Sequence, residues 1–155
     1  MLHFAYGANM DPRVMHRHAP GAVPLGIAAL AHHRFVITAD GYASVAPARR
    51  QTVYGVLWRL TPRDRIKLDL WENVAGRKYR TDLMPVQQAG RRHAALVYVG
   101  TARRPGRPRA GYMELVVTAA RQRQLPPAYM TTLQAWLRAR PSGAGPRSLK
   151  ELGWP

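Results

Sequence analysis

The hydrophobic pattern of the first forty residues predicts a strand, a short helix and then more strand. The apolar run at residues 3–6 is typical of a short strand. Asp11 suits a helix N-cap and Pro12 the first helical position, and Pro20 followed by Gly21 ends that helix. Residues 22–38 are apolar with little helical period, which indicates two strands that meet near the histidines at 32–33.

The middle of the chain continues with strands and a second helix. We expect a short strand at 42–46, and the alternation of residues along 52–60 predicts a buried strand. Thr61, Pro62 and Asp64 are typical of a helix start, with a capping side chain, a proline in the first turn and an acid after it. Ile66 and Leu70 share one face of that helix.

The last third predicts two paired strands, at 78–86 and 93–99 around a turn at 87–92, then a Pro/Gly loop at 103–109. Helices follow at 111–123 and 126–140. The order of elements lacks a regular β-α-β alternation, so it favours a compact mixed sheet or small barrel with helices outside. We expect one domain over residues 1–140 and a Gly/Pro-rich tail over 141–155.

Composition excludes several classes of protein. The chain has no cysteine, which excludes a disulfide scaffold, a thiol nucleophile and cysteine-ligated zinc. No apolar run approaches the length of about 20 residues that a membrane helix needs. Nothing at the N-terminus resembles a signal peptide, because charge and proline come before any long apolar run. The expectation is a cytoplasmic protein without membrane contact.

The charge is strongly unbalanced, with 24 Lys and Arg against 8 Asp and Glu and a net charge of +16. We favour a solvated, arginine-rich surface, because the basic residues are scattered and no nucleic-acid-binding motif accompanies them. Binding to a polyanion such as nucleic acid remains a less favoured alternative. A third possibility is attraction of small anionic substrates by the overall field.

Glutamate is scarce, and Glu72 is the most suggestive. It follows Trp71 and precedes a glycine-containing loop, and an acid in an apolar pocket has a raised pKa that suits general acid–base work. The alternative, which spacing alone favours, is a helix-end carboxylate paired with Arg77 or Arg80.

The turn at residues 6–9 could direct backbone N–H groups at an anion, or be an ordinary strand-to-helix turn capped by Asn9.

The six histidines lack acids at metal-ligand spacing, so no metal site is predicted. No serine lies in a nucleophile-elbow motif, and no glycine-rich phosphate loop is present.

Several motifs in a fixed order resemble the gamma-glutamylcyclotransferase-like family, which includes gamma-glutamylamine cyclotransferases and plant AIG2-like proteins. The pattern F-x-Y-G-S-N-L/M corresponds to residues 4–10, and V-x-G-x-x-W/Y to 53–58. The segment L-D-x-x-E-G followed by Y-x-R corresponds to 68–80. Two later tyrosines and the helix after residues 125–129 also match, so that the resemblance covers about residues 2–137.

The resemblance implies an α+β fold, a small mixed-strand β-barrel flanked by helices with a pocket at the barrel mouth. It implies an enzyme that releases 5-oxoproline from a gamma-glutamyl amide or amine, by attack of the substrate's α-amine on its γ-carbonyl, without a cofactor. Glu72 matches the catalytic glutamate. The residues that match the substrate-binding positions are His3, Phe4, Ala5, Tyr6, Gly7, Ala8, Asn9, Tyr79, Tyr98 and Tyr112.

The chain departs from the family pattern at two positions. It has Ala8 where the pattern has serine and Asn73 where it has glycine, although asparagine tolerates left-handed backbone angles. The loss of the serine hydroxyl keeps open a catalytically silent, small-molecule-binding domain of the same fold. The sequence indicates neither the leaving amine nor the oligomeric state.

Overall fold

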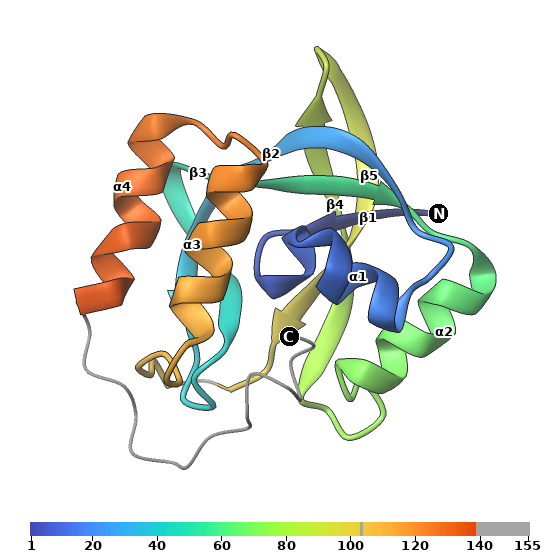
Figure 1. The fold of residues 1–155 in the computed structure, drawn as a ribbon, viewed down its shortest axis with the longest axis horizontal. Coiled ribbons are helices and arrows are strands. Elements are labelled where there is room, and N and C mark those ends of the chain that lie inside the picture. Colours follow the sequence, from blue (N-terminus) through green and yellow to red (C-terminus); the bar gives the residue numbers. More distant parts are fainter. Residues whose placement is uncertain (103, 139–155) are drawn as a thin grey trace.

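The computed structural model describes residues 1–102 and 104–138, in which five strands close a barrel in the order β1-β3-β2-β4-β5 (Figure 1). This confirms the predicted mixed-strand barrel flanked by helices, whereas the predicted tail lies outside the described residues. The strands are β1 Leu2–Ala5, β2 Val23–Ile37, β3 Ala43–Arg59, β4 Tyr79–Gln88 and β5 Arg91–Gly100. The helices are η1 Ala8–Met10, α1 Pro12–His18, α2 Pro62–Trp71, α3 Tyr112–Gln122, α4 Pro127–Ala135 and η2 Trp136–Arg138.

Strand β1 makes the barrel mixed and closes it. It runs antiparallel to β3 and parallel to β5, where His3 pairs with Leu96. Gly55 of β3 allows this arrangement, because a Cβ at that position would lie 2.2 Å from the carbonyl oxygen of Ala5. The glycine of the V-x-G motif is therefore required by the close approach of two strands at the barrel wall.

The long strands β2 and β3 differ from the prediction of four shorter ones. The expected break near residue 32 is a bulge, where His32 has a φ of 58° and the register with β3 shifts between Ala31 and His33. A bulge bends a strand without ending its ladder, so the two predicted strands form one continuous β2. In the same way, the two strands predicted at 42–46 and 52–60 belong to one β3.

The paired strands β4 and β5 are confirmed, but their turn is shorter than the predicted turn at 87–92, because β4 continues to Gln88 and β5 begins at Arg91. Ala89 and Gly90 occupy the tip of the turn with φ of 49° and 75°. Positive φ at both central residues matches the right-handed twist of the flanking strands, and only a glycine adopts it without cost.

The predicted helix starts are confirmed. The side chain of Asp11 caps α1 by accepting a hydrogen bond from the backbone N–H of Arg13 at 2.7 Å. Thr61 and Asp64 form a reciprocal capping box at the start of α2. The face formed by Ile66 and Leu70, however, points to solvent, with 62% and 73% of these residues exposed.

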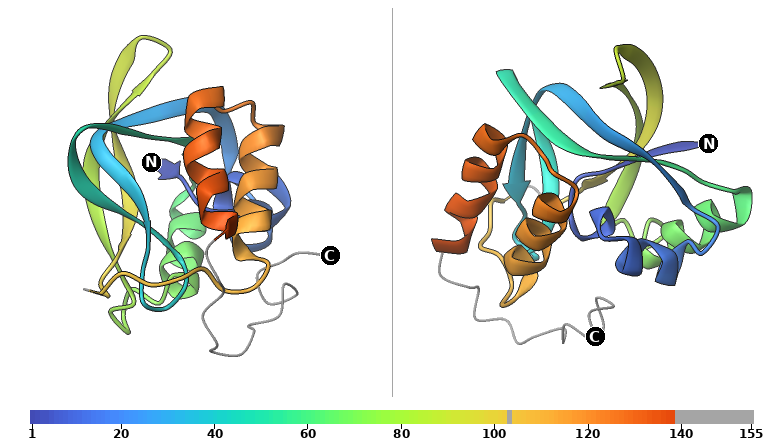
Figure 2. Two further views of the ribbon diagram at one scale, coloured as in Figure 1. Left: turned by 90° about the vertical axis from the view of Figure 1, so that its left-hand side faces the viewer. Right: turned by 45° about the horizontal axis from the view of Figure 1, so that its top comes forward.

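The helices form two groups around the barrel. Helices α3 and α4 pack together on one side, and α1 and α2 lie together on another, with η1 against α3 (Figures 1 and 2). The loop after β1 therefore lies between the two groups, at one end of the barrel (Figure 1). No helix in the described part of the chain is long and apolar enough to span a membrane.

Candidate active site

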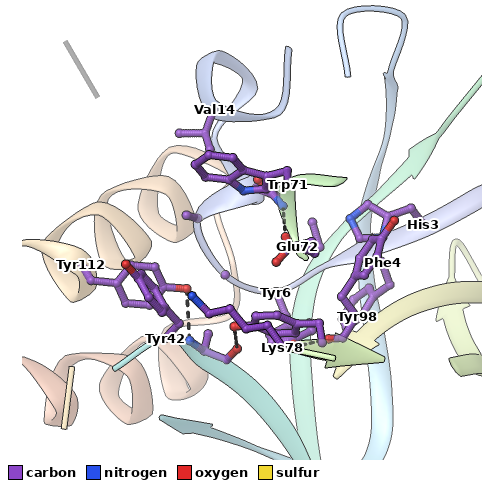
Figure 3. Close-up of a pocket in the computed structure, with 16 residues that line it drawn as sticks. His3, Phe4, Tyr6, Val14, Tyr42, Trp71, Glu72, Lys78, Tyr98 and Tyr112 are labelled. Carbon is purple, nitrogen blue, oxygen red and sulfur yellow. Dashed lines mark hydrogen bonds between the residues drawn. The ribbon is translucent and has the colours of Figure 1, made fainter. Parts of the chain in front are cut away.

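A cavity of about 80 Å³ opens where the loop after β1 meets the end of α2, the start of β4 and the start of α3 (Figure 3). Every residue that the sequence suggested for the site lines this cavity. These are Glu72 together with His3, Phe4, Ala5, Tyr6, Gly7, Ala8, Asn9, Tyr79, Tyr98 and Tyr112. The fold thus brings segments from both halves of the chain to one place.

Glu72 is the acid of this pocket. It is the C-cap residue of α2, and its Oε1 accepts a hydrogen bond of 3.0 Å from the side-chain amide of Asn9. Burial raises the pKa of Glu72 to about 7, although the Asn9 hydrogen bond and the charge of Lys78 both favour the ionised form. The carboxyl group can therefore exchange a proton near neutral pH.

Neither Arg77 nor Arg80, which the spacing suggested as ion-pair partners, forms an ion pair with Glu72. Arg80 instead forms an ion pair with Asp82 at 2.7 Å, and Arg77 is exposed in the loop after α2. That loop turns sharply after the glutamate because Asn73 adopts a left-handed φ of 51°. The Asn73 side chain also accepts a hydrogen bond from the Gly76 N–H at 3.1 Å, so asparagine supports the turn where the family pattern has glycine.

The loop after β1 forms the opposite wall of the pocket. A Cβ at Gly7 would lie 2.9 Å from the hydroxyl oxygen of Tyr112 and 3.3 Å from Cβ of Ala43, so this position needs a glycine for close packing. Residues 8–10 form the single turn η1, which has no side-chain cap. The alternative in which Asn9 caps the turn is thus wrong, and its amide reaches Glu72 instead.

Hydrogen bonds fix the tyrosines in the pocket wall. The Tyr6 hydroxyl donates to the carbonyl oxygen of Tyr98, and the Tyr79 hydroxyl donates to that of Ala43 at 2.8 Å. The Tyr112 hydroxyl accepts from the Ala43 N–H at 3.3 Å. Burial raises the pKa of Tyr6, Tyr79, Tyr98 and Tyr112, so these four side chains stay neutral and act as polar, rigid walls.

Asp69 supports this wall from outside the cavity. It accepts a hydrogen bond from the Tyr98 hydroxyl at 2.7 Å, and the Arg65 guanidinium holds it at 2.8 Å. The aspartate of the L-D-x-x-E motif therefore orients a pocket tyrosine, one helical turn before Glu72.

The sequence did not suggest the remaining lining residues, which are Val14, Tyr42, Ala43, Trp71 and Lys78. Lys78 directly precedes the tyrosine of the Y-x-R motif, which is the signal that could have identified it. Its ammonium lies 4.5 Å from the ring centre of Tyr42, at the distance of a cation–π contact. Tyr42 is the last residue of the connection between β2 and β3, and Ala43 begins β3; no motif marks either residue.

Metal ligands do not converge in the described part of the chain. Across residues 1–102 and 104–138, no three His, Asp or Glu side chains gather where they could hold an ion. The pocket offers a carboxyl group, an imidazole, an ammonium group and backbone amides, which suit a small polar ligand.

The chain is similar to several proteins of one fold. It superposes on a gamma-glutamyl cyclotransferase with a TM-score of 0.85 and 22% identity, covering 97% of this chain and 95% of that one. An uncharacterised human protein gives 0.84 and 22%, covering 97% and 94%. A yeast gamma-glutamyl cyclotransferase specific to glutathione gives 0.59 and 13%, covering 88% and 95%.

The family of this chain is identified by comparing its amino-acid sequence with those of known proteins. Among curated protein sequences, none is similar enough to count as a match. The model of the AIG2-like family matches residues 52–133, a span that includes Gly55, Asp69, Glu72 and the pocket tyrosines of β4, β5 and α3. The chain therefore belongs to the AIG2-like family and has the gamma-glutamyl cyclotransferase fold.

Proposed function

We propose that this protein is a gamma-glutamyl cyclotransferase-type enzyme, which converts a gamma-glutamyl amide or amine into 5-oxoproline and a free amine. Glu72 is the general acid–base, and residues 3–9, which form the end of β1 and the loop after it, hold the glutamyl group. The observation that carries the proposal is the position of Glu72, an acid with a pKa raised to about 7 that faces this loop across the cavity.

The reaction needs one proton carrier and a shaped pocket. The Glu72 carboxylate takes a proton from the substrate α-ammonium, and the freed amine attacks the γ-carbonyl carbon to form a five-membered ring. Protonated Glu72 then gives this proton to the leaving nitrogen as the amide C–N bond breaks. The ring nitrogen still carries a second proton of the original ammonium group, which passes through the Glu72 carboxylate to the released amine, so that the products are the lactam and an ammonium ion. No water is consumed and no covalent enzyme intermediate forms, so the absence of cysteine is no obstacle.

Positioning supplies much of the rate in an intramolecular reaction of this kind. An extended glutamyl chain must fold back so that its amine meets its own carbonyl, and a pocket that binds the folded form removes the entropic cost. The fixed tyrosines and the packed Gly7 turn support such a role, because their hydrogen bonds and contacts leave the wall little freedom.

The test is release of 5-oxoproline, measured by mass spectrometry, from a panel of gamma-glutamyl amino acids and gamma-glutamylamines. Glu72→Gln keeps the shape of the side chain and removes the proton transfer, so turnover should fall by about 10²- to 10⁴-fold. Glu114→Gln is the matched control, because Glu114 is exposed on α3 and should leave turnover unchanged. Near-wild-type turnover by Glu72→Gln would remove Glu72 from the mechanism.

A further inference from the structure

Nε2 of His3 is among the polar atoms of the pocket that have no role in the reaction as described so far. His3 is 2% exposed, and its Nδ1 lies 3.1 Å from the carbonyl oxygen of Leu96. Because a carbonyl oxygen only accepts, Nδ1 of the neutral ring carries the hydrogen and Nε2 carries a lone pair. Within the described residues, this buried Nε2 has no hydrogen-bond partner.

The neighbouring hydroxyl groups are engaged elsewhere. The Tyr6 hydroxyl donates to the carbonyl oxygen of Tyr98, and the Tyr98 hydroxyl donates to Asp69. The ring of Tyr98 meets the His3 imidazole edge to face at 5.3 Å and so fixes the plane of the imidazole. An unpaired acceptor that is fully buried is costly, and a ligand that donates a hydrogen would remove that cost.

The position of His3 indicates which part of a ligand it meets. Trp71 and Lys78 line the same pocket but are partly exposed, whereas His3 is almost completely buried, so His3 belongs to the deep end. In Figure 3, Glu72 lies between His3 on one side and Tyr42 and Tyr112 on the other. The leaving amine must depart to solvent, so the glutamyl group occupies the deep end, and its hydrogen-bond donor is the α-ammonium.

We propose that Nε2 of His3 accepts a hydrogen bond from the α-ammonium of the glutamyl group and holds this nitrogen beside Glu72. The inference rests on the proposed function and assigns His3 as a substrate-positioning residue. His3 takes no proton in the reaction: burial lowers its pKa to about 4, so it stays neutral while Glu72 accepts the proton. The lone pair that is freed on deprotonation first faces Glu72, so the amino group must rotate about its Cα–N bond before it attacks, and the hydrogen bond to His3 keeps the nitrogen in position near the γ-carbonyl while it does so.

Nitrogen NMR of the wild-type protein tests the first step without any turnover. With ¹⁵N-labelled histidine, the resonances of His3 are assigned by their loss in His3→Gln. We expect the Nδ1–H tautomer in the free protein at pH 7. Finding the hydrogen on Nε2, or a doubly protonated ring, would overturn the proposal and leave the proposed function standing.

The ligand step uses two probes that differ only in the amino group. L-glutamate should shift the Nε2 resonance of His3, because its α-ammonium donates to that atom, whereas glutarate should not. An unchanged Nε2 resonance at concentrations of L-glutamate that move the backbone amides of residues 6–8 would overturn the proposal. The proposal would also be overturned if L-glutamate shifted no resonance of the residues that line the pocket.

Kinetics separate positioning from a structural role. His3→Phe keeps a ring but lacks the acceptor, and should lower kcat/KM about 10- to 100-fold. His3→Gln has both a donor for Leu96 and an acceptor, and should recover most of that loss. His33→Gln, at a histidine of β2 outside the pocket, is the matched control. Equal losses of kcat/KM in folded His3→Phe and His3→Gln would contradict the acceptor role. If the wild-type protein released no 5-oxoproline from any compound of the panel, the proposed function itself would be contradicted.

Discussion

Replacing Glu72 by glutamine should stabilise the protein above neutral pH, as well as stop turnover. Glu72 has a pKa of about 7 in the folded chain, against 4.5 for an ordinary glutamate. Between these values the folded state holds a proton that the unfolded state has released, so the stability of the wild type falls as the pH rises. Glutamine has no proton to lose and escapes this penalty.

The size of the effect follows from the pKa difference. Each pKa unit is worth about 1.4 kcal/mol, so the interval from 4.5 to about 7 gives an upper figure of about 3 kcal/mol at pH 8. Glu72 is not completely enclosed, and solvent screening reduces that figure. We therefore expect Glu72→Gln to be about 1–3 kcal/mol more stable than wild type at pH 8, and equal to it near pH 4.

Urea denaturation followed by circular dichroism between pH 4 and pH 8.5 measures this difference. The control is Glu114→Gln, whose exposed side chain should leave the pH dependence of the wild type unchanged. A constant difference between Glu72→Gln and wild type over the whole range would refute the reasoning. A variant that loses stability as the pH rises, relative to wild type, would refute it more strongly, because it would mean that the ionised carboxylate is stabilised by the fold.

Three further substitutions test other parts of the account. Asn9→Ala removes the hydrogen bond that favours ionised Glu72, so the acid limb of kcat/KM should move to higher pH by about half a unit or more; a limb that stays or moves down would contradict this contact. Gly55→Ala places a methyl group against the carbonyl oxygen of Ala5 and should cost at least about 2 kcal/mol, seen as a thermal midpoint lower by about 6 °C; an unchanged midpoint would mean that β1 and β3 are not this close. Ala8→Ser restores a hydroxyl to the pocket and should leave the thermal midpoint unchanged while raising or broadening activity across the gamma-glutamyl panel; identical activity would show that the alanine is without consequence.

Local signals in the sequence were sufficient for much of the fold. The caps at Asp11 and Thr61 and the turn at Gly90 depend on hydrogen bonds and backbone angles within a few residues, so they could be predicted directly. The lengths of β2 and β3 could not. Whether His32 ends a strand or forms a bulge depends on the partner strand, and the sequence of β2 alone does not contain that information.

For the candidate site too, local sequence patterns predicted some features, and other features depend on contacts between distant segments. Spacing along α2 favoured an ion pair for Glu72 with Arg77 or Arg80, and the folded chain instead places it against Asn9, which lies far away in the sequence. Lys78 and Tyr42 escaped notice because their relation to the pocket arises only when the connection after β2 packs against the start of β4. Resemblance to a family supplied the grouping of these segments, and local patterns did not.

The central claim is that the substrate's own amine, and not water, displaces the leaving amine in a reaction that depends on Glu72. A reaction of a gamma-glutamyl substrate in H₂¹⁸O, followed by mass spectrometry of both products, tests it most directly. The account predicts unlabelled 5-oxoproline in equal amount to the released amine with wild type, and about 10²- to 10⁴-fold less with Glu72→Gln. Glutamate that carries one ¹⁸O atom would reveal hydrolysis and contradict the claim, as would equal rates of 5-oxoproline release from the two proteins.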